Sequence, residues 1–266
     1  MTNTTLNIET LENKAKIIRR HIINMLCNAE SGHTGGSLSC VDILVALYFS
    51  FMNHKQKDKF ILSKGHAAPA LYATLAELGY FSLDKLKTLR KNDGYLQGHP
   101  VSTIPGIVAS SGSLGQGLSI ANGIALAAKL DKLQSKIFVL LGDGECDEGQ
   151  VWEAAMLSSH YKLDNLIAIV DRNQLQIDGK TEDIMRLEPF AEKWKSFGWH
   201  VFETNGNNIE EIIYTLNSTK YVVDRPSVII ANTIKGKGVS FCEGVLSFHG
   251  TPPNKEQSLK ALEELK

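Results

Sequence analysis

The chain has 266 residues, 43% of them apolar, and a formal net charge of −1 at pH 7. This length supports one substantial hydrophobic core or at most two small ones, and the balanced charge gives no general attraction to nucleic acids or acidic membranes. The four cysteines are widely spaced with no Cys-x-x-Cys pair, which argues against structural zinc and a disulfide framework. The chain starts with a polar stretch that is no signal peptide, and no apolar run reaches the length of a membrane span, so we expect a cytoplasmic protein.

The first predicted element is an amphipathic helix over residues 10–30, where apolar residues recur at intervals of three and four. It ends in a turn-rich loop, residues 31–36, and a second helix is expected over residues 39–52. His33 lies in that loop, flanked by glycines. A histidine in such a loop is more often exposed than buried, so an ordinary turn residue and a functional residue both stay open.

A short strand is predicted at residues 60–62, and it leads into Ser-Lys-Gly-His at residues 63–66. His66 therefore sits at a turn from strand to helix, where a loop side chain often faces a cleft. His99 lies in Gly-His-Pro, and the bond to proline favours an extended backbone before it. For each of these two histidines alone, a capping or turn role is the alternative.

A glycine-rich loop at residues 110–117 precedes a predicted long helix that runs through Ala128. The start of a helix exposes unpaired N–H groups and the positive end of the helix dipole, which suits an anion or a polar ring. The alternative is a flexible N-cap with no ligand.

The central stretch reads as strand, helix and strand, at residues 137–141, 150–162 and 166–170. Such a βαβ unit has parallel strands and binds ligands at their carboxyl ends. Asp143 follows the first strand and Asn173 follows the second. We therefore expect the two side chains at the same edge of the sheet.

A carboxylate and a carboxamide are hard oxygen donors that suit Mg²⁺ or Ca²⁺. Gly142 and Gly144 flank Asp143 and leave room for a diphosphate close to the backbone. The alternative is an ordinary turn in which Asp143 caps a helix. The unit lacks a Gly-x-Gly-x-x-Gly fingerprint and the chain lacks a phosphate-binding Gly-x-x-x-x-Gly-Lys-Ser/Thr loop, so NAD and ATP are poorly supported.

After this unit we expect an amphipathic helix at residues 209–220 and a buried strand at 226–231. Lys235 comes just past that strand, where a solvated surface lysine is the default interpretation. A charged helix at residues 255–266 is most simply a solvated face. The alternation of strands and helices predicts one doubly wound α/β domain, with a mainly parallel sheet and helices on both of its faces.

The central motif carries a family resemblance. Gly-Asp-Gly at residues 142–144, with 28 residues between it and Asn173, resembles the thiamine-diphosphate motif. Its extension, Gly-Asp-Gly-Glu-Cys-x-Glu-Gly-x-x-Trp-Glu-Ala, is similar to the form found in transketolases. The resemblance implies that Asp143, Asn173 and the backbone carbonyl of Leu175 bind Mg²⁺, with Ca²⁺ or Mn²⁺ as substitutes, and that this ion holds the diphosphate of thiamine diphosphate.

Further segments are similar to transketolases along nearly the whole chain: Ser-Gly-His at 31–33, Leu-Ser-Lys-Gly-His-Ala at 62–67, Gly-His-Pro at 98–100, Gly-Ser-Leu-Gly-Gln-Gly at 112–117, Lys-Gly-x-Gly at 235–238 and His-Gly at 249–250. The resemblance implies these cofactor contacts: Lys64, His66, Gly112, Ser113, Leu114, Asp143, Gly144, Asn173, Lys235 and His249. It implies catalytic roles for His33, His66, His99 and His249, and it places Glu148 at a subunit interface near the opposing active site.

Transketolases that are single chains continue into a second domain, and nothing in these 266 residues corresponds to it. The resemblance therefore implies that residues 1–266 are a single thiamine-diphosphate-binding domain of the diphosphate-binding (PP) type. This domain would be the N-terminal subunit of a split transketolase. With a complementary C-terminal subunit that carries the pyrimidine-binding domain, in an α₂β₂ assembly, it would transfer a two-carbon ketol unit from a ketose or ketose phosphate to an aldose or aldose phosphate.

Two alternatives stay open. One is a subunit of another thiamine-diphosphate enzyme, such as a 2-oxoacid dehydrogenase E1 component, although that family lacks the Ser-Lys-Gly-His and Gly-His-Pro histidines. The other is a non-catalytic binding or regulatory subunit, which would predict eroded ligands. The chain retains Asp143, Asn173 and the family's histidines.

Overall fold

The computed structural model describes residues 6–266, so part of the polar start of the chain, where we expected no signal peptide, lies outside the described residues. Within this range five strands form one sheet in the order β1-β2-β3-β5-β4, and every neighbouring pair is parallel. The strands are β1 Lys59–Leu62, β2 Ile137–Gly142, β3 Leu166–Arg172, β4 His200–Asn205 and β5 Ser227–Asn232. The expected parallel α/β sheet is confirmed, and the carboxyl ends of all these strands share one edge.

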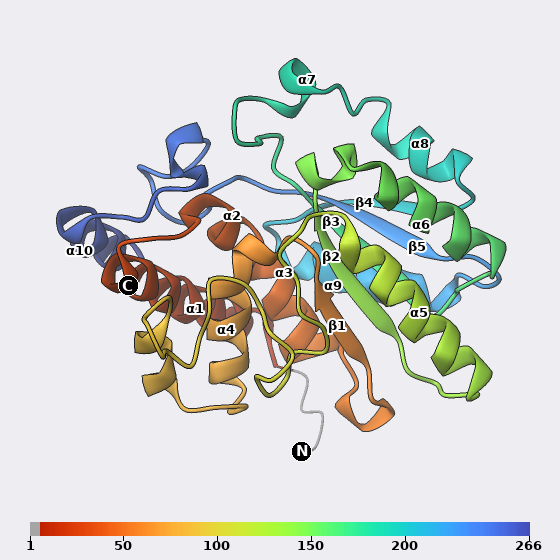
Figure 1. The fold of residues 1–266 in the computed structure, drawn as a ribbon, viewed down its shortest axis with the longest axis horizontal. Coiled ribbons are helices and arrows are strands. Elements are labelled where there is room, and N and C mark those ends of the chain that lie inside the picture. Colours follow the sequence, from red (N-terminus) through yellow and green to blue (C-terminus); the bar gives the residue numbers. More distant parts are fainter. Residues whose placement is uncertain (1–5) are drawn as a thin grey trace.

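Helices cover both faces of the sheet (Figure 1). On one side lie α1 Ile8–Ala29, α2 Thr34–Ser39, α3 Val41–Ala46, α4 Ala68–Glu77, α9 Ile209–Ser218 and α10 Lys255–Glu264. On the other side lie α5 Gln116–Leu130, α6 Gly149–His160 and α8 Phe190–Ser196, and the short α7 Thr181–Ile184 lies in the segment between β3 and α8. Short 3-10 segments include η3 Gly65–Ala67, η5 Gly144–Asp147 and η7 Leu246–His249.

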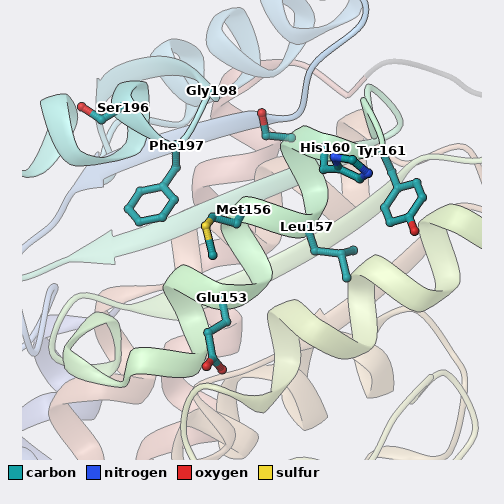
Figure 2. Close-up of a pocket in the computed structure, with 9 residues that line it drawn as sticks. Glu153, Met156, Leu157, His160, Tyr161, Ser196, Phe197 and Gly198 are labelled. Atoms are coloured by element: carbon teal, nitrogen blue, oxygen red, sulfur yellow. The ribbon is translucent and has the colours of Figure 1, made fainter.

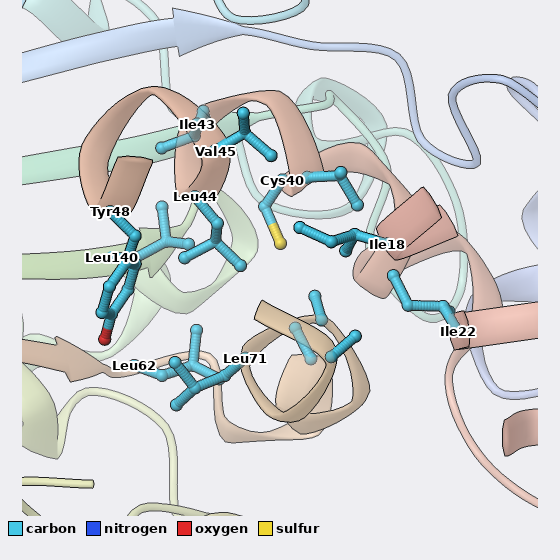
Figure 3. Close-up of a cluster of buried hydrophobic side chains, with 14 of the residues drawn as sticks. Ile18, Ile22, Cys40, Ile43, Leu44, Val45, Tyr48, Leu62, Leu71 and Leu140 are labelled. Carbon is cyan, nitrogen blue, oxygen red and sulfur yellow. The ribbon is translucent and has the colours of Figure 1, made fainter. Parts of the chain in front are cut away.

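The central strands are largely apolar because both of their faces are buried, and β3 carries Asp171 and Arg172 only at its carboxyl end. In β2, Phe138 and Leu140 point into the hydrophobic cluster under α1, α3, α4 and α9, whereas Val139 and Leu141 point into the cluster under α5, α6 and α8. Figure 3 shows Leu140 in the first cluster together with Leu44 of α3. The sheet is therefore a rigid layer between two cores, and its carboxyl edge is a fixed base for loops.

The helix predicted for residues 39–52 is present as α3, from Val41, and the π-helix Leu47–Phe51 that follows it. A short helix that we did not predict, α2 Thr34–Ser39, comes before it and takes up part of the predicted loop at residues 31–36. Glycines are poor helix formers, but here close packing explains them. A Cβ on Gly35 would lie 2.9 Å from Cγ of Lys235, and a Cβ on Gly36 would lie 3.1 Å from Nε2 of His66. The missing side chains thus let α2 approach both residues.

The C-terminal helix is not the fully solvated face that its charges suggested. In α10, Ala261 is buried, as is Leu265 just after the helix, and both belong to the cluster that includes α1. Asn254 caps the helix in a capping box with Gln257. The charged side chains lie on the outer face, and Leu259 there is 72% exposed.

One helical window, Thr34–Phe51, has the length and apolar composition of a membrane span. The expectation from uninterrupted apolar runs did not include it, because polar residues interrupt it. Of this window, 83% is buried inside the fold. It comprises α2, α3 and the π-helix Leu47–Phe51, whose apolar side chains pack into the core.

Candidate functional site

The two side chains predicted to bind a metal lie at the carboxyl edge of the sheet. Asp143 directly follows β2, and Asn173 directly follows β3. The Asp143 carboxylate is 2% exposed and accepts hydrogen bonds from the N–H groups of Gly144 (2.9 Å) and Gln174 (2.6 Å). Asn173 Oδ1 accepts from the N–H of Leu175 at 3.2 Å. The Asp143 side chain therefore lies against the turn that carries Asn173 and Leu175, as the βαβ interpretation predicted.

The charge on Asp143 is poorly compensated. Burial and the nearby carboxylate of Asp171 raise the pKa of Asp143 to about 6. The nearest cation, the guanidinium of Arg172, is 3.5 Å away and also binds Glu182 and Glu188. A divalent cation beside Asp143 would remove this electrostatic cost.

The donor set fits such a cation. Among residues 6–266, no group of three His, Cys, Asp or Glu side chains is placed to hold a metal. A cation here would be bound by one carboxylate, one carboxamide and one main-chain carbonyl, those of Asp143, Asn173 and Leu175. Hard cations with so few protein ligands complete their shell with oxygens from water or from a bound phosphate.

Three of the four predicted histidines come together. The ring centroids of His33 and His66 are 5.1 Å apart, and the ring of His249 lies 5.7 Å from each of them. They come from the N-cap of α2, from η3 and from η7. His99 lies beside them, on the loop next to Gly112, where a Cβ on Gly112 would be 3.6 Å from the His99 ring.

These imidazoles are neutral at neutral pH. Burial, followed by the charge of Arg90, lowers the pKa of His33 to about 4. Burial and Lys235 lower the pKa of His249 to about 3, and burial and Lys64 hold the pKa of His66 well below its usual value. A neutral imidazole offers one donor and one acceptor nitrogen. Nδ1 of His33 is buried and has no hydrogen-bond partner, so it is available to a polar group of a ligand.

Lys235 is buried, not solvated as the default interpretation had it. Its Nζ lies 2.7 Å from the carbonyl oxygen of Leu175 and 2.8 Å from Nδ1 of His249. Burial and the charge of Lys64 lower its pKa to about 8. Lys235 therefore brings a positive charge directly to the carbonyl that the family resemblance assigns to the metal.

Asp171, near the carboxyl end of β3, is a site residue that our sequence reasoning missed. It is fully buried, forms an ion pair with Lys64, and accepts hydrogen bonds from the hydroxyls of Ser39 and Thr233. Lys64 also donates to the carbonyl of Gly36 at 2.9 Å. Burial acts to raise the pKa of Asp171, but Lys64 outweighs it and the pKa is lowered. A charged residue inside an otherwise apolar strand is the signal that could have revealed it.

Glu145 was missed as well. Its Oε1 accepts hydrogen bonds from the hydroxyl of Ser63 and from the N–H of Gly115 at 2.8 Å, and its Oε2 accepts from the N–H of Gly142 at 2.9 Å. The Ser63 hydroxyl in turn accepts from the N–H of Gly117 at 3.1 Å. The expectation that the start of α5 offers unpaired N–H groups is therefore wrong for Gly115 and Gly117.

Arg90 is the third residue that the sequence did not single out. Its guanidinium donates to the hydroxyl of Ser31 at 3.1 Å, and a Cβ on Gly98 would lie 3.0 Å from its Cζ. It thus lies between the loop that carries His33 and the loop that carries His99. Its charge helps to lower the pKa of both histidines.

The remaining predicted residues lie around this cluster, and their roles stay predictions. Ser113 is exposed, and the carbonyl of Leu114 accepts from Gln150 at 2.9 Å. The N–H of Gly144 is bonded to Asp143. Glu148 is exposed at the N-cap of α6 and makes no capping hydrogen bond with its side chain, so it is free to meet another chain.

A surface hollow lies elsewhere, between α6 and the end of α8 (Figure 2). It is lined by Glu153, Met156, Leu157, Ser159, His160, Tyr161, Ser196, Phe197 and Gly198. None of the predicted site residues lines it. The candidate site therefore rests on the side-chain cluster at the carboxyl edge of the sheet.

Comparison with known proteins points to one family. The family model described as "Transketolase, thiamine diphosphate binding domain" matches residues 11–265. The chain is 44% identical to a subunit of the apulose-4-phosphate transketolase of Phocaeicola vulgatus, over 98% of this chain and 95% of that protein. It is also 44% identical to 6-deoxy-6-sulfo-D-fructose transketolase subunit SqwG of a Clostridium species, over 96% of each.

The solved structures agree with the fold. The transketolase of Campylobacter jejuni superposes with a TM-score of 0.92 at 34% identity, and the match covers 98% of this chain and 43% of that chain. The transketolase of Leishmania mexicana gives a TM-score of 0.88 at 29% identity. The chain thus spans about two fifths of the length of the solved transketolases that it matches.

We expect Asp171→Asn to lower the free energy of unfolding by about 3–5 kcal/mol, because it leaves the Lys64 ammonium buried without a counter-charge. Denaturant unfolding measures this change. The matched control is Asp84→Asn, since Asp84 pairs with Lys87 on the surface; we expect no measurable change there. An equal, small effect of both substitutions would contradict the importance of the buried pair.

We expect the stability of the ligand-free chain to fall as the pH is lowered from 7 to 5. The unfolded chain gains protons on its histidines near pH 6.5, whereas folded His249 stays neutral until about pH 3, so the unfolded state binds more protons in this window. After a discount for partial exposure, His249 accounts for about 1–2 kcal/mol of that fall. In His249→Gln the loss should be smaller by this amount, as measured by denaturant midpoints at both pH values; identical pH profiles would refute the assignment.

Proposed function

The chain belongs to the transketolase family, in which it matches the thiamine-diphosphate-binding domain, and from this we propose that it is the diphosphate-binding subunit of a two-chain transketolase. Relatives that are themselves named as transketolase subunits match it along nearly their whole length, which supports a separate partner chain. We further propose that residues 1–266 act as one domain, in a cytoplasmic α₂β₂ assembly. The cysteines at residues 27, 40, 146 and 242 are free, in keeping with a reducing compartment.

The observation that carries the proposal is the charge arrangement at the sheet edge. Lys235 lies against the Leu175 carbonyl and Nδ1 of His249, and the ring of His249 lies beside those of two further neutral histidines. The Asp143 carboxylate lies against the same turn, and its pKa is raised to about 6. If a diphosphate bound here through Mg²⁺, Asp143 would hold the cation, and Lys64, Lys235 and the imidazoles would be the groups that meet the phosphate oxygens.

In this proposal Asp143, Asn173 and the carbonyl of Leu175 hold Mg²⁺, for which Ca²⁺ or Mn²⁺ can substitute. In the ligand-free chain the Leu175 carbonyl is bonded to Lys235. If a cation were bound by this carbonyl, the Lys235 ammonium would be free to pair with a phosphate oxygen. Lys235 thus contributes in both states.

When bound, thiamine diphosphate supplies the carbanion chemistry that breaks and forms the carbon–carbon bond of a ketose. The chain's own part is to bind, orient and move protons. The rings of His33, His66 and His249 pack against one another, and we propose that a sugar hydroxyl or carbonyl exchanges a proton with one of these imidazoles. Burial is the largest cause of the low pKa values of these histidines, and nearby charges, Lys235 and Lys64 among them, lower these values further. The negative charge of a bound diphosphate would act in the opposite direction to the lysines.

The remaining assignments complete the site. His99 lies at its rim beside Gly112, and we propose that the backbone of Gly112, Ser113 and Leu114 contacts the cofactor. Gly144 keeps the backbone open next to Asp143. Glu148, exposed at the start of α6, is proposed to face a neighbouring subunit near its active site.

The sugar is a separate matter. Two relatives of equal identity to this chain are named for different sugars, apulose 4-phosphate and 6-deoxy-6-sulfo-D-fructose. We propose a ketose, phosphorylated or sulfonated, as the donor. The groups that select it are expected on the partner subunit.

We expect Asp143→Ala to abolish the Mg²⁺-dependent retention of thiamine diphosphate, because it removes the only carboxylate among the proposed ligands. Calorimetric titration of the full chain should show affinity reduced by about 100-fold or more, the scale of losing a charged metal ligand. Asp131→Ala, at the exposed end of α5, is the control and should bind as the wild type does. Unchanged retention in Asp143→Ala would reject the metal assignment.

We expect the purified chain with thiamine diphosphate and Mg²⁺ to be inactive alone and to gain ketol transfer when a complementary C-terminal subunit is added. The reason is that the groups that surround the pyrimidine ring and the sugar phosphate belong to the second domain. A coupled assay with a ketose phosphate donor and an aldose phosphate acceptor measures this. Full ketol transfer by the chain alone would count decisively against a two-chain enzyme.

A further inference from the structure

One buried carboxylate is bonded to three separate segments of the chain. Glu145 is 3% exposed and lies in η5, just below the candidate site. It accepts from Ser63 after β1, from Gly115 before α5, and from Gly142 at the end of β2. Since Gly117 donates to the Ser63 hydroxyl, the first two segments are also joined to each other.

Glu145 is held by neutral donors. Within residues 6–266 no Lys, Arg or His forms an ion pair with it. Oε1 accepts two hydrogen bonds and Oε2 accepts one. A side chain at this position must therefore have a hydrogen-bond acceptor at both terminal atoms, as a carboxylate does. An amide at this position offers one oxygen and one NH₂ group, so one end would place a donor against a donor.

The packing around these bonds leaves little freedom. A Cβ on Gly117 would lie 2.4 Å from Oγ of Ser63, and Gly115 has a φ of +82°, a left-handed conformation that favours glycine. The loop before α5 and the turn after β1 are therefore in direct contact. Their relative position follows from the carboxylate that both of them bind.

Each of the three segments carries residues proposed above to bind the cofactor. The segment of Ser63 continues into Lys64 and His66, the segment of Gly115 begins with residues 112–114, and the segment of Gly142 continues into Asp143. A substitution at Glu145 is therefore expected to shift the proposed cofactor-binding residues of all three segments, although Glu145 itself is buried in the protein interior.

We infer that Glu145 is a positioning residue which aligns these three loops and thereby sets the affinity of the chain for thiamine diphosphate. The cofactor half of this inference rests on the proposed function. Glu145 acts through Ser63, Gly115 and Gly142 and does not touch the cofactor.

The test compares Glu145→Gln with the wild type and with Glu12→Gln, a matched change at an exposed position of α1. Hydrogen exchange of the ligand-free full chain follows the N–H groups of Gly115 and Gly142. Both should exchange faster in Glu145→Gln and at the wild-type rate in Glu12→Gln. Calorimetric titration with thiamine diphosphate and Mg²⁺, well below the unfolding temperature, should show affinity weakened by about 10- to 100-fold, the effect of losing a hydrogen bond to a charged group.

Ser63→Ala is a milder second variant, which keeps the chain folded if Glu145→Gln does not fold. It removes one donor to the carboxylate and should weaken cofactor affinity to a smaller extent. Because the two residues act through one bond, the double variant Ser63→Ala/Glu145→Gln should be weakened by less than the product of the single effects. Ser63→Ala with wild-type exchange and wild-type affinity would overturn the inference.

The outcomes separate the role of Glu145 from the proposed function. A wild-type chain that binds no thiamine diphosphate contradicts the proposed function and, with it, the cofactor half of the inference. A wild-type chain that binds while Glu145→Gln binds equally well, or exchanges Gly115 and Gly142 at the wild-type rate, overturns the role of Glu145 alone.

Discussion

The buried ion pair between Lys64 and Asp171 is the interaction on which the candidate site depends. Asp171 also binds the hydroxyls of Ser39 and Thr233, so one carboxylate at the end of β3 joins α2, the turn after β1 and the loop after β5. Those three elements carry His33, His66 and Lys235. A buried pair costs much of its Coulomb energy in desolvation, so its benefit here is chiefly the fixed geometry of the side chains around it.

A second carboxylate completes the support. Glu145 binds the loop before α5 and the end of β2, and it shares the turn after β1 with Asp171, since Ser63 binds Glu145 and Lys64 binds Asp171. Glu145 uses neutral donors, whereas Asp171 pairs with a cation, and the sheet between its two cores keeps both acids in place. Asp143 lies against the turn after β3, accepts two N–H bonds and has Arg172 at 3.5 Å, and burial and Asp171 still raise its pKa to about 6. Asp171 and Glu145 hold the loops around the site, and Asp143 is the carboxylate that we propose as a metal ligand.

The local sequence pattern predicted the parallel strands and the position of the proposed metal ligands, but not the buried carboxylates that hold the surrounding loops. The apolar runs around residues 143 and 173 predicted parallel strands, and this placed Asp143 and Asn173 at one edge; the family resemblance supplied the histidines. Asp171 and Glu145 were missed because their partners are remote: Lys64 is 107 residues from Asp171, and Ser63 is 82 residues from Glu145. The periodic spacing of apolar residues indicates local helices and strands and carries no information on contacts between such distant residues. The short helix α2 and the docking of α10 were missed for a related reason, since each depends on packing against a distant element.

The central claim is that the sheet edge is a preformed site in which Asp143 faces a divalent cation and buried acids hold the surrounding loops. The most direct measurement is a crystal structure of the full chain with thiamine diphosphate and Mg²⁺. The account predicts the metal at Asp143, Asn173 and the Leu175 carbonyl, the diphosphate beside the His33, His66 and His249 cluster, and unchanged bonds from Asp171 and Glu145 to their loops. A cofactor bound elsewhere, or a site that forms only after these bonds are broken, would contradict it.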